Sequence, residues 1–167
     1  SLGHQPLETR SCMAYWENGK VYVYGSTQST ARTLGAVARW AEVAPENVVL
    51  VSEFCGGGFG SKGAGSTSMR FPIVMSKKSG KPGMMRISRR EENFIGRARP
   101  AVQARAKIGF RRDGRILAMD LFTVGDGGPY GRSGDHMSLA NIASLAYQPE
   151  SIRVRGVGVY TNTPPRA

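Results

Sequence analysis

The chain has 167 residues, of which 40% are hydrophobic, and it carries a formal net charge of +11. This length supports one packed core, so we expect a single domain over residues 1–167, and the 22 glycines, which gather in turns and one loop, exclude collagen-like and low-complexity proteins. No run approaches the roughly 18 apolar residues of a membrane span, and the first eight residues lack the pattern of a signal peptide.

The two cysteines, Cys12 and Cys55, lie far apart in the sequence, with no second cysteine or histidine at the spacing of metal ligands. This pattern predicts neither a zinc site nor a disulfide framework. We therefore expect no metal ligand in this chain and a reducing compartment, the cytoplasm, with the periplasm as the alternative.

The first predicted elements are a β-hairpin and a helix. Two β-prone runs in Cys12–Tyr24 flank Asn18 and Gly19, a pair that supplies the positive φ angles of a two-residue turn. Apolar residues then recur at helical spacing over residues 31–43, and the preceding Ser26 and Thr27 are expected to cap that helix.

A strand, a glycine loop and a second helix are predicted next. Residues 48–51 are four consecutive apolar residues, which predicts a buried strand. The loop Cys55–Gly65 follows directly. Residues 67–78 then predict a helix that Pro72 interrupts and Gly80 ends, and residues 84–88 predict a strand.

The remaining elements give the fold class. Residues 102–123 predict a second hairpin around Asp113 and Gly114, followed by a glycine-rich loop at 125–134, a short helix at 136–146 and a strand at 152–160. This order predicts an α+β fold with a mixed β-sheet, hairpins and two to three covering helices.

The glycine loop is the main candidate site. A loop between a strand and a helix presents several backbone N–H groups toward one point, which is typical of a site for a phosphate or an oxyanion. Gly58, Gly60 and Gly63 satisfy the GxGxxG pattern, but no acidic residue lies between Glu53 and Glu91, as a dinucleotide site would require. From spacing alone, a tight turn that needs glycine for packing is an equal alternative.

Four motifs in order give a more specific signal. They are the segment Pro6–Glu8 (PLE), the segment Ser26–Gln28 (STQ), the turn Pro45–Asn47 (PEN) and the loop Gly56–Lys62 (GGGFGSK). Together they resemble the large subunit of the molybdenum hydroxylases, the xanthine dehydrogenase and aldehyde oxidase family. The resemblance covers the whole chain.

The resemblance implies a molybdopterin site. In the family, the glutamine that matches Gln28 hydrogen-bonds an oxo ligand of molybdenum without binding the metal itself, and the loop that matches Gly57, Gly58, Phe59 and Gly60 offers backbone donors to the cofactor. It also implies partners: the rest of the large subunit, iron–sulfur and FAD subunits or domains, and a small aldehyde or heterocyclic substrate. Without the resemblance, Gln28 is better explained as a helix residue and Phe59 as a core aromatic.

Two departures bear on catalysis. Family members that oxidise purines have a glutamate after the loop lysine, where this chain has Gly63. The family's proton-abstracting glutamate lies further along the subunit than Ala167. We therefore expect the chain to be a piece of the molybdopterin-binding subunit that contains no catalytic residue and is inactive alone.

A basic stretch supports a rival function. Residues 86–115 hold ten Lys or Arg against three Asp or Glu, interleaved with Phe94 and Phe110. This composition suits a nucleic-acid-binding groove with stacking rings. The alternative, favoured because Arg105, Lys107 and Arg112 alternate with apolar residues, is an exposed sheet face that pairs with acidic neighbours. A purely structural interaction domain is the third reading.

Overall fold

The computed structural model describes residues 2–130 and 135–164. They form two compact units: an N-terminal unit of residues 4–97, and a C-terminal unit of residues 2–3 with the described residues from 98 onward. Two compact units can fold together or separately, so the expectation of a single folding domain stays a prediction. Among the described residues, no helix is long and apolar enough to cross a membrane.

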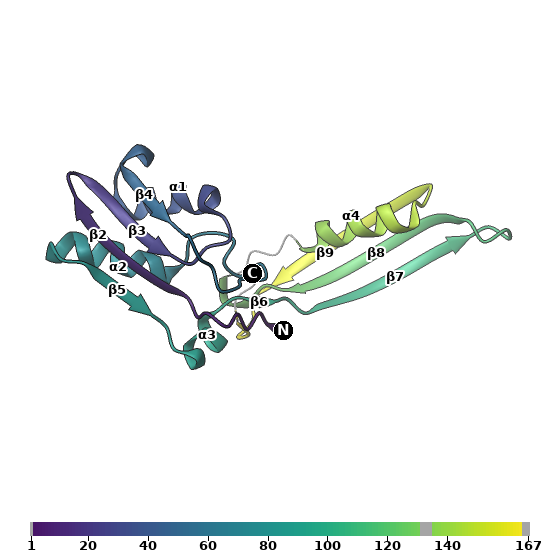
Figure 1. Cartoon of the computed structure of the whole chain (residues 1–167). Helices are drawn as coiled ribbons and strands as arrows, with labels where there is room; N and C mark the ends of the chain where they lie inside the picture. The colour runs from purple at the N-terminus through teal and green to yellow at the C-terminus, as the bar shows by residue number, and fades with distance from the viewer. Residues whose placement is uncertain (1, 131–134, 165–167) are drawn as a thin grey trace. The chain divides into compact units, whose positions relative to one another are not determined.

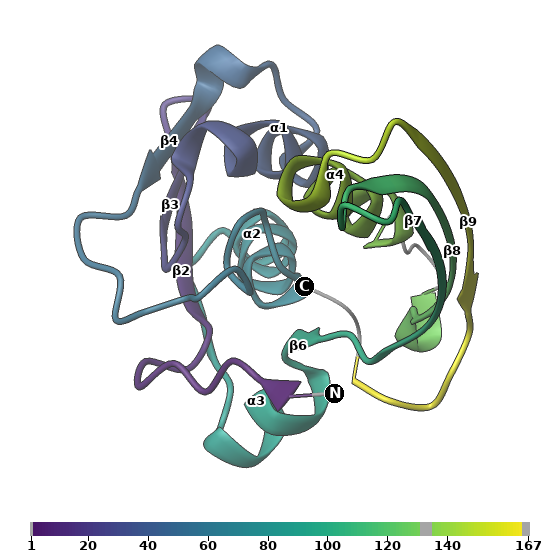
Figure 2. The same ribbon diagram turned by 90° about the vertical axis from the view of Figure 1, so that its right-hand side faces the viewer.

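The N-terminal unit is a mixed four-stranded sheet with two helices on one face (Figures 1 and 2). Its strands lie in the order β4-β3-β2-β5, in which only the β3–β4 pair is parallel. The elements are β2 (Ser11–Glu17), β3 (Lys20–Gly25), α1 (Thr30–Ala41), β4 (Val48–Val51), α2 (Thr67–Ser79), β5 (Gly83–Arg86) and α3 (Arg89–Ile95).

The predicted first hairpin is confirmed. Strands β2 and β3 pair antiparallel, with Glu17 opposite Lys20 across the turn. Asn18 and Gly19 have φ angles of 50° and 75°, the positive values that a two-residue turn requires.

The core of this unit lies between the sheet and the two helices. Alternate residues of β2 and β3 point toward the helices, while Tyr15 and Tyr22 stack on the opposite face with ring centroids 4.8 Å apart. Core residues that are almost fully buried are Cys12, Ala14, Val21, Val23, Val37, Ala41, Met69 and Ile73. Burial raises the pKa of the Cys12 thiol to about 12.

Three local expectations for this unit are wrong. Ser29, not Ser26 or Thr27, caps α1, because its hydroxyl accepts the hydrogen bond of the Arg32 amide. Helix α2 runs unbroken through Pro72, which stands in its second turn. Strand β4 is only half-buried, because it lies at the edge of the sheet.

Helix α3 was not predicted. Ser88 and Glu91 form a capping box, in which the Ser88 hydroxyl accepts from the Glu91 amide and the Glu91 carboxylate accepts from the Ser88 amide. The spacing Ser-x-x-Glu is the sequence signal that announces such a helix.

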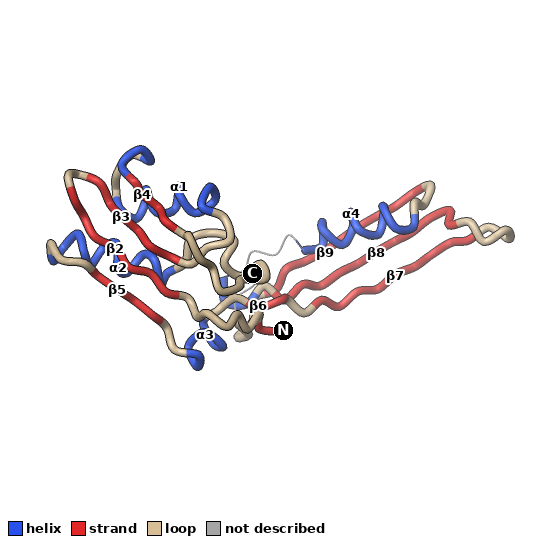
Figure 3. Tube along the Cα trace, in the orientation of Figure 1, coloured by secondary structure: helices blue, strands red, loops and turns tan. Residues whose placement is uncertain are grey.

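The C-terminal unit contains a three-stranded sheet and one long helix (Figure 3). Strand β7 (Val102–Phe110) pairs antiparallel with β8 (Ile116–Asp126), and β8 pairs parallel with β9 (Ser151–Val159). Helix α4 (Asp135–Tyr147) packs against β8 and β9. A short pair, β1 (Leu2–Gly3) and β6 (Ala98–Arg99), completes the unit.

The second hairpin and the last two elements are confirmed. Ile108 lies opposite Met119 as the alternation predicts, and a register shift beyond Gly109 places Phe110 opposite Ile116. Part of the predicted loop over 125–134 falls on residues 131–134, outside the described residues. Both units combine helices with mixed or antiparallel strands, which confirms the α+β class.

The hydroxyl of Thr123 gives a stability prediction. Thr123 is 2% exposed in β8, and its Oγ1 has no hydrogen-bond partner among the described residues. An unsatisfied buried hydroxyl costs about 1–3 kcal/mol, so Thr123→Val, which keeps the shape, should leave the free energy of unfolding unchanged or raise it by about 1 kcal/mol. Urea denaturation of the chain measures the change.

Thr33→Val is the matched control. Thr33 is fully buried, but its hydroxyl lies 2.8 Å from that of Thr27, so its removal should lower the free energy of unfolding by about 1 kcal/mol or more. A loss for Thr123→Val as large as that for Thr33→Val would contradict the assignment.

Candidate functional site

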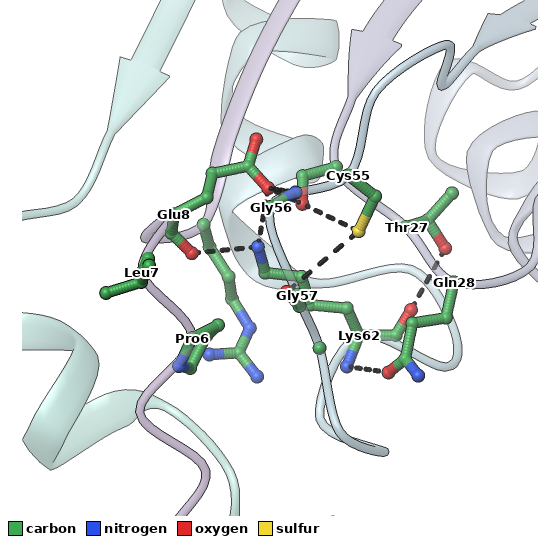
Figure 4. Close-up of polar contacts among 12 residues, drawn as sticks. Pro6, Leu7, Glu8, Thr27, Gln28, Cys55, Gly56, Gly57 and Lys62 are labelled. Atoms are coloured by element: carbon green, nitrogen blue, oxygen red, sulfur yellow. Dashed lines mark hydrogen bonds and ion pairs between the residues drawn. The ribbon is translucent and has the colours of Figure 1, made fainter.

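Three of the sequence motifs meet at one place in the N-terminal unit (Figure 4). The segment that leads into β2 brings Glu8, the segment between β3 and α1 brings Gln28, and the loop between β4 and α2 brings residues 56–62. The Glu8 amide donates to the Gly56 carbonyl over 3.3 Å, and the Gln28 amide donates to the Lys62 carbonyl over 2.9 Å. Backbone hydrogen bonds therefore tie both segments to the loop.

A buried ion pair lies beneath the loop. The Lys62 side chain is 1% exposed, and its ammonium donates to the Glu8 carboxylate and to the Glu8 backbone carbonyl, each over 2.8 Å. The same carboxylate oxygen accepts from the Ser26 hydroxyl at 2.6 Å and from the Gly56 amide at 2.8 Å. One carboxylate thus joins all three segments.

The surroundings of Glu8 keep it ionised. Partial burial acts to raise the pKa of its carboxyl, but the hydrogen bonds from Lys62, Ser26 and Gly56, with the Lys62 charge, outweigh it and hold the pKa below the ordinary value of 4.5. The Lys62 ammonium thus has an ionised partner in Glu8.

The Gln28 side chain is held by the loop itself. Its Oε1 accepts from the Gly60 amide at 2.9 Å and from the Lys62 amide at 3.1 Å. Because both partners are N–H donors, the atom they meet must be the oxygen, which fixes the orientation of the side-chain amide. The Nε2 group then keeps two N–H donors, and no described residue accepts from them.

The loop backbone needs glycine at defined positions. Gly57 and Gly60 have φ angles of 94° and 101°, which L side chains rarely adopt. A Cβ at Gly58 would lie 2.4 Å from Gln28 Oε1, so a side chain there would displace Gln28. Phe59 has a φ of 52° although it is not glycine, and the residue is 63% exposed. Such strain in a bulky residue persists where the surroundings impose it and is frequent at functional sites.

The predicted site residues are brought together but do not all present free donors. Four of them lie in the glycine loop: Gly57, Gly58, Phe59 and Gly60. The fifth, Gln28, is hydrogen-bonded to that loop. The amides of Gly57 and Gly58 donate to no described residue, whereas the Gly60 amide already donates to Gln28. The roles of these five residues in cofactor binding stay predictions.

A second buried ion pair was missed by the sequence analysis. Arg10 in the segment before β2 pairs with Glu92 of α3, and its guanidinium also donates to the Ser61 carbonyl over 2.7 Å. Burial, and then the charge of Arg97, lower the pKa of Arg10 to about 10. The sequence signal for this ion pair was the acidic first turn of α3, a helix that the sequence analysis did not predict.

The basic stretch is divided between the two units. Residues 86–97 belong to the N-terminal unit and residues 98–115 to the C-terminal unit, so Phe94 and Phe110 lie in different units. Arg105 and Lys107 do share an exposed face of β7, as expected, but Arg112 lies beyond the end of that strand.

The ion pair beneath the loop predicts an asymmetric response to mutation. Glu8→Ala leaves the enclosed Lys62 ammonium without its carboxylate and should cost roughly 2–4 kcal/mol, less than a fully buried pair because Glu8 is 33% exposed. Lys62→Met leaves a carboxylate that keeps the Ser26 and Gly56 donors and some water, and should cost about 1–2 kcal/mol. Urea denaturation of each variant compares them, and a larger loss for Lys62→Met would refute the assignment.

The lowered pKa of Glu8 predicts a pH effect. A carboxyl whose folded pKa is depressed contributes stability above its unfolded pKa, 4.5, and loses it as pH falls below that value through the folded pKa. Wild type should therefore lose more stability than Glu8→Gln between about pH 6 and pH 3. Denaturant midpoints across that range test this, with Glu46→Gln as the control at an exposed carboxylate. Parallel curves for wild type and Glu8→Gln would contradict it.

Comparisons with known proteins show the family of the chain. Residues 1–167 match the model of the molybdopterin cofactor-binding domain. The chain is 29% identical over 163 residues to the aldehyde oxidoreductase of Megalodesulfovibrio gigas and 30% identical over 167 residues to the xanthine dehydrogenase/oxidase of Rattus norvegicus, matches that cover 95% and 96% of this chain.

Solved structures show the same fold. Quinoline 2-oxidoreductase from Pseudomonas putida 86 superposes with a TM-score of 0.87 at 22% identity, and aldehyde oxidoreductase from Desulfovibrio gigas with a TM-score of 0.86 at 27% identity; each match covers 99% of this chain. The chain spans 22% and 18% of those two chains, and 18% and 12% of the two sequence relatives. By its match over residues 1–167, the chain belongs to the molybdopterin cofactor-binding domain family of the xanthine dehydrogenases and aldehyde oxidoreductases.

Proposed function

We propose that this chain contributes part of the molybdopterin site of an enzyme that hydroxylates an aldehyde or an N-heterocycle with oxygen taken from water. The observation that carries the proposal is the fixed side chain of Gln28. Two loop amides hold its oxygen, so its Nε2 donors are available to an acceptor beside the glycine loop.

The residues present fit a molybdenum cofactor. Metal oxo groups and phosphates are electron-rich acceptors, and they gain from donors that are already oriented before binding. Nε2 of Gln28 and the amides of Gly57 and Gly58 are such donors. The absence of a Cβ at Gly58 leaves room for the Gln28 side chain, whose Oε1 would lie 2.4 Å from such an atom.

The donor set indicates which tasks belong to this chain and which to the cofactor. When bound, the molybdenum cofactor would supply the oxygen-transfer and two-electron redox chemistry, with iron–sulfur and FAD partners as the route for the electrons. This chain's residues orient and hold: Gln28 donates toward an acceptor, the glycine loop supplies backbone N–H groups, and the Glu8–Lys62 pair keeps the loop in shape. No catalytic residue is assigned within the chain.

The names of the relatives support the substrate class. The similar proteins include an aldehyde oxidoreductase, a quinoline 2-oxidoreductase and a nicotinate hydroxylase. Gly63, at the position where purine-oxidising members have a glutamate, favours an aldehyde or a non-purine heterocycle. The cytoplasm stays the expected compartment.

Gln28→Ala tests the proposal. The variant is made in the full-length enzyme that contains this chain, purified with its cofactor bound. Removing a preorganised donor should lower kcat for aldehyde or N-heterocycle oxidation by about a hundred-fold. Molybdenum content, measured by elemental analysis, should fall much less, because several segments hold the cofactor. Gln28→Glu, which keeps the acceptor oxygen but loses the N–H donors, should be as impaired as Gln28→Ala. Full activity in either variant would overturn the role of Gln28.

The 167-residue chain by itself should hold far less than one molybdenum and show no hydroxylase activity. Each exposed hydrogen bond contributes only about 0.5–1.5 kcal/mol net, so a few loop donors cannot retain a charged cofactor against water. Elemental analysis and an aldehyde or quinoline oxidation assay measure both quantities. Near one molybdenum per chain would show that the site is more complete than proposed.

A further inference from the structure

The C-terminal unit has a cationic sheet face that the proposed cofactor site does not use. Residues paired across β7, β8 and β9 form two neighbouring rows, Arg105–Phe122–Arg155 and Lys107–Asp120–Arg153. Directly paired residues share one face of a sheet. This face therefore gathers four cations around one carboxylate and one aromatic ring, and we name these six residues the basic face.

The charges of the basic face are unevenly satisfied. Asp120 is held by Arg153, at 2.5 Å and 3.1 Å, and by Arg155, whose Nη2 lies 3.3 Å from both carboxylate oxygens. The hydrogen bond from Arg153 is the main reason that the pKa of Asp120 lies below its ordinary value. No described residue forms an ion pair with Arg105 or Lys107, so the N–H donors of these two cations are available to a binding partner.

The shape of the basic face suits an extended segment. A shallow hollow of about 250 Å³ is lined by Arg105, Lys107, Asp120, Phe122 and Arg155, and a second of about 370 Å³ shares Lys107 and Asp120 with it. Arg105 and Lys107 are two residues apart on one strand, so their side chains repeat at roughly 7 Å. Carboxylates at alternate positions of an extended chain repeat at the same interval.

We propose that the basic face docks an acidic, extended segment of another protein, with its carboxylates on Arg105 and Lys107. A second copy of these 167 residues suits this face poorly as the occupant, because it carries a formal net charge of +11. A single-stranded nucleic acid would need rings free for stacking, and here the one ring, Phe122, already has the Arg155 guanidinium above it at 5.9 Å.

The test uses the 167-residue chain and a fluorescein-labelled peptide of alternating glutamate and serine, followed by fluorescence anisotropy at low salt. The double variant Arg105→Gln/Lys107→Gln should weaken binding by about three- to ten-fold, as expected for two exposed ion pairs. The double variant Arg70→Gln/Lys78→Gln removes the same charge types from exposed positions of α2 and should leave the affinity within about two-fold.

Two results would overturn the proposal. Equal weakening in both double variants would mean that the peptide responds only to net charge. Tighter binding of a labelled oligothymidine than of the peptide, lost with Arg105→Gln/Lys107→Gln, would assign the basic face to nucleic acid. Circular dichroism of both variants confirms that the fold is intact before the comparison is made.

Discussion

The candidate site depends on the enclosed ammonium of Lys62. A cation that is 1% exposed is tolerated only with a close counter-charge, and Glu8 supplies it from a segment 54 positions earlier in the chain. Since the same carboxylate oxygen also accepts from Ser26 and Gly56, three segments are fixed relative to one another by one charge. These contacts therefore fix the loop relative to the sheet and the helices.

A second ion pair supports the loop at the residue before Lys62. Arg10 lies two residues after Glu8, pairs with Glu92 of α3, and donates to the Ser61 carbonyl, next to Lys62. The two pairs together hold both neighbours at the carboxyl end of the glycine loop. This explains how Phe59 keeps a positive φ, which costs energy locally and is retained only where the surroundings determine it.

The sequence predicted what local signals control. The turn at Asn18 and Gly19, the glycine loop and the periodic helices depend on neighbouring residues, and each is confirmed. The cap at Ser29 was missed because several hydroxyl residues precede α1, and the choice among them depends on long-range contacts: Thr27 is engaged instead with Thr33 and the Lys62 carbonyl. The partnership of Glu8 with Lys62 was equally invisible, because neither residue type nor spacing announces an ion pair between distant segments.

The same contacts explain why ordered motifs were more specific than the glycine pattern. A GxGxxG spacing requires only a flexible loop, and many unrelated proteins meet that requirement. Here Gly58 must lack a Cβ because Gln28 lies where that atom would stand, and Gln28 is fixed because the Gly60 and Lys62 amides hold its oxygen. The glycine loop and the Ser-Thr-Gln segment therefore require each other physically. The Pro-Leu-Glu segment joins them through the Glu8–Lys62 pair. Three motifs that are distant in sequence act as one structural unit, which a search for the loop alone cannot detect.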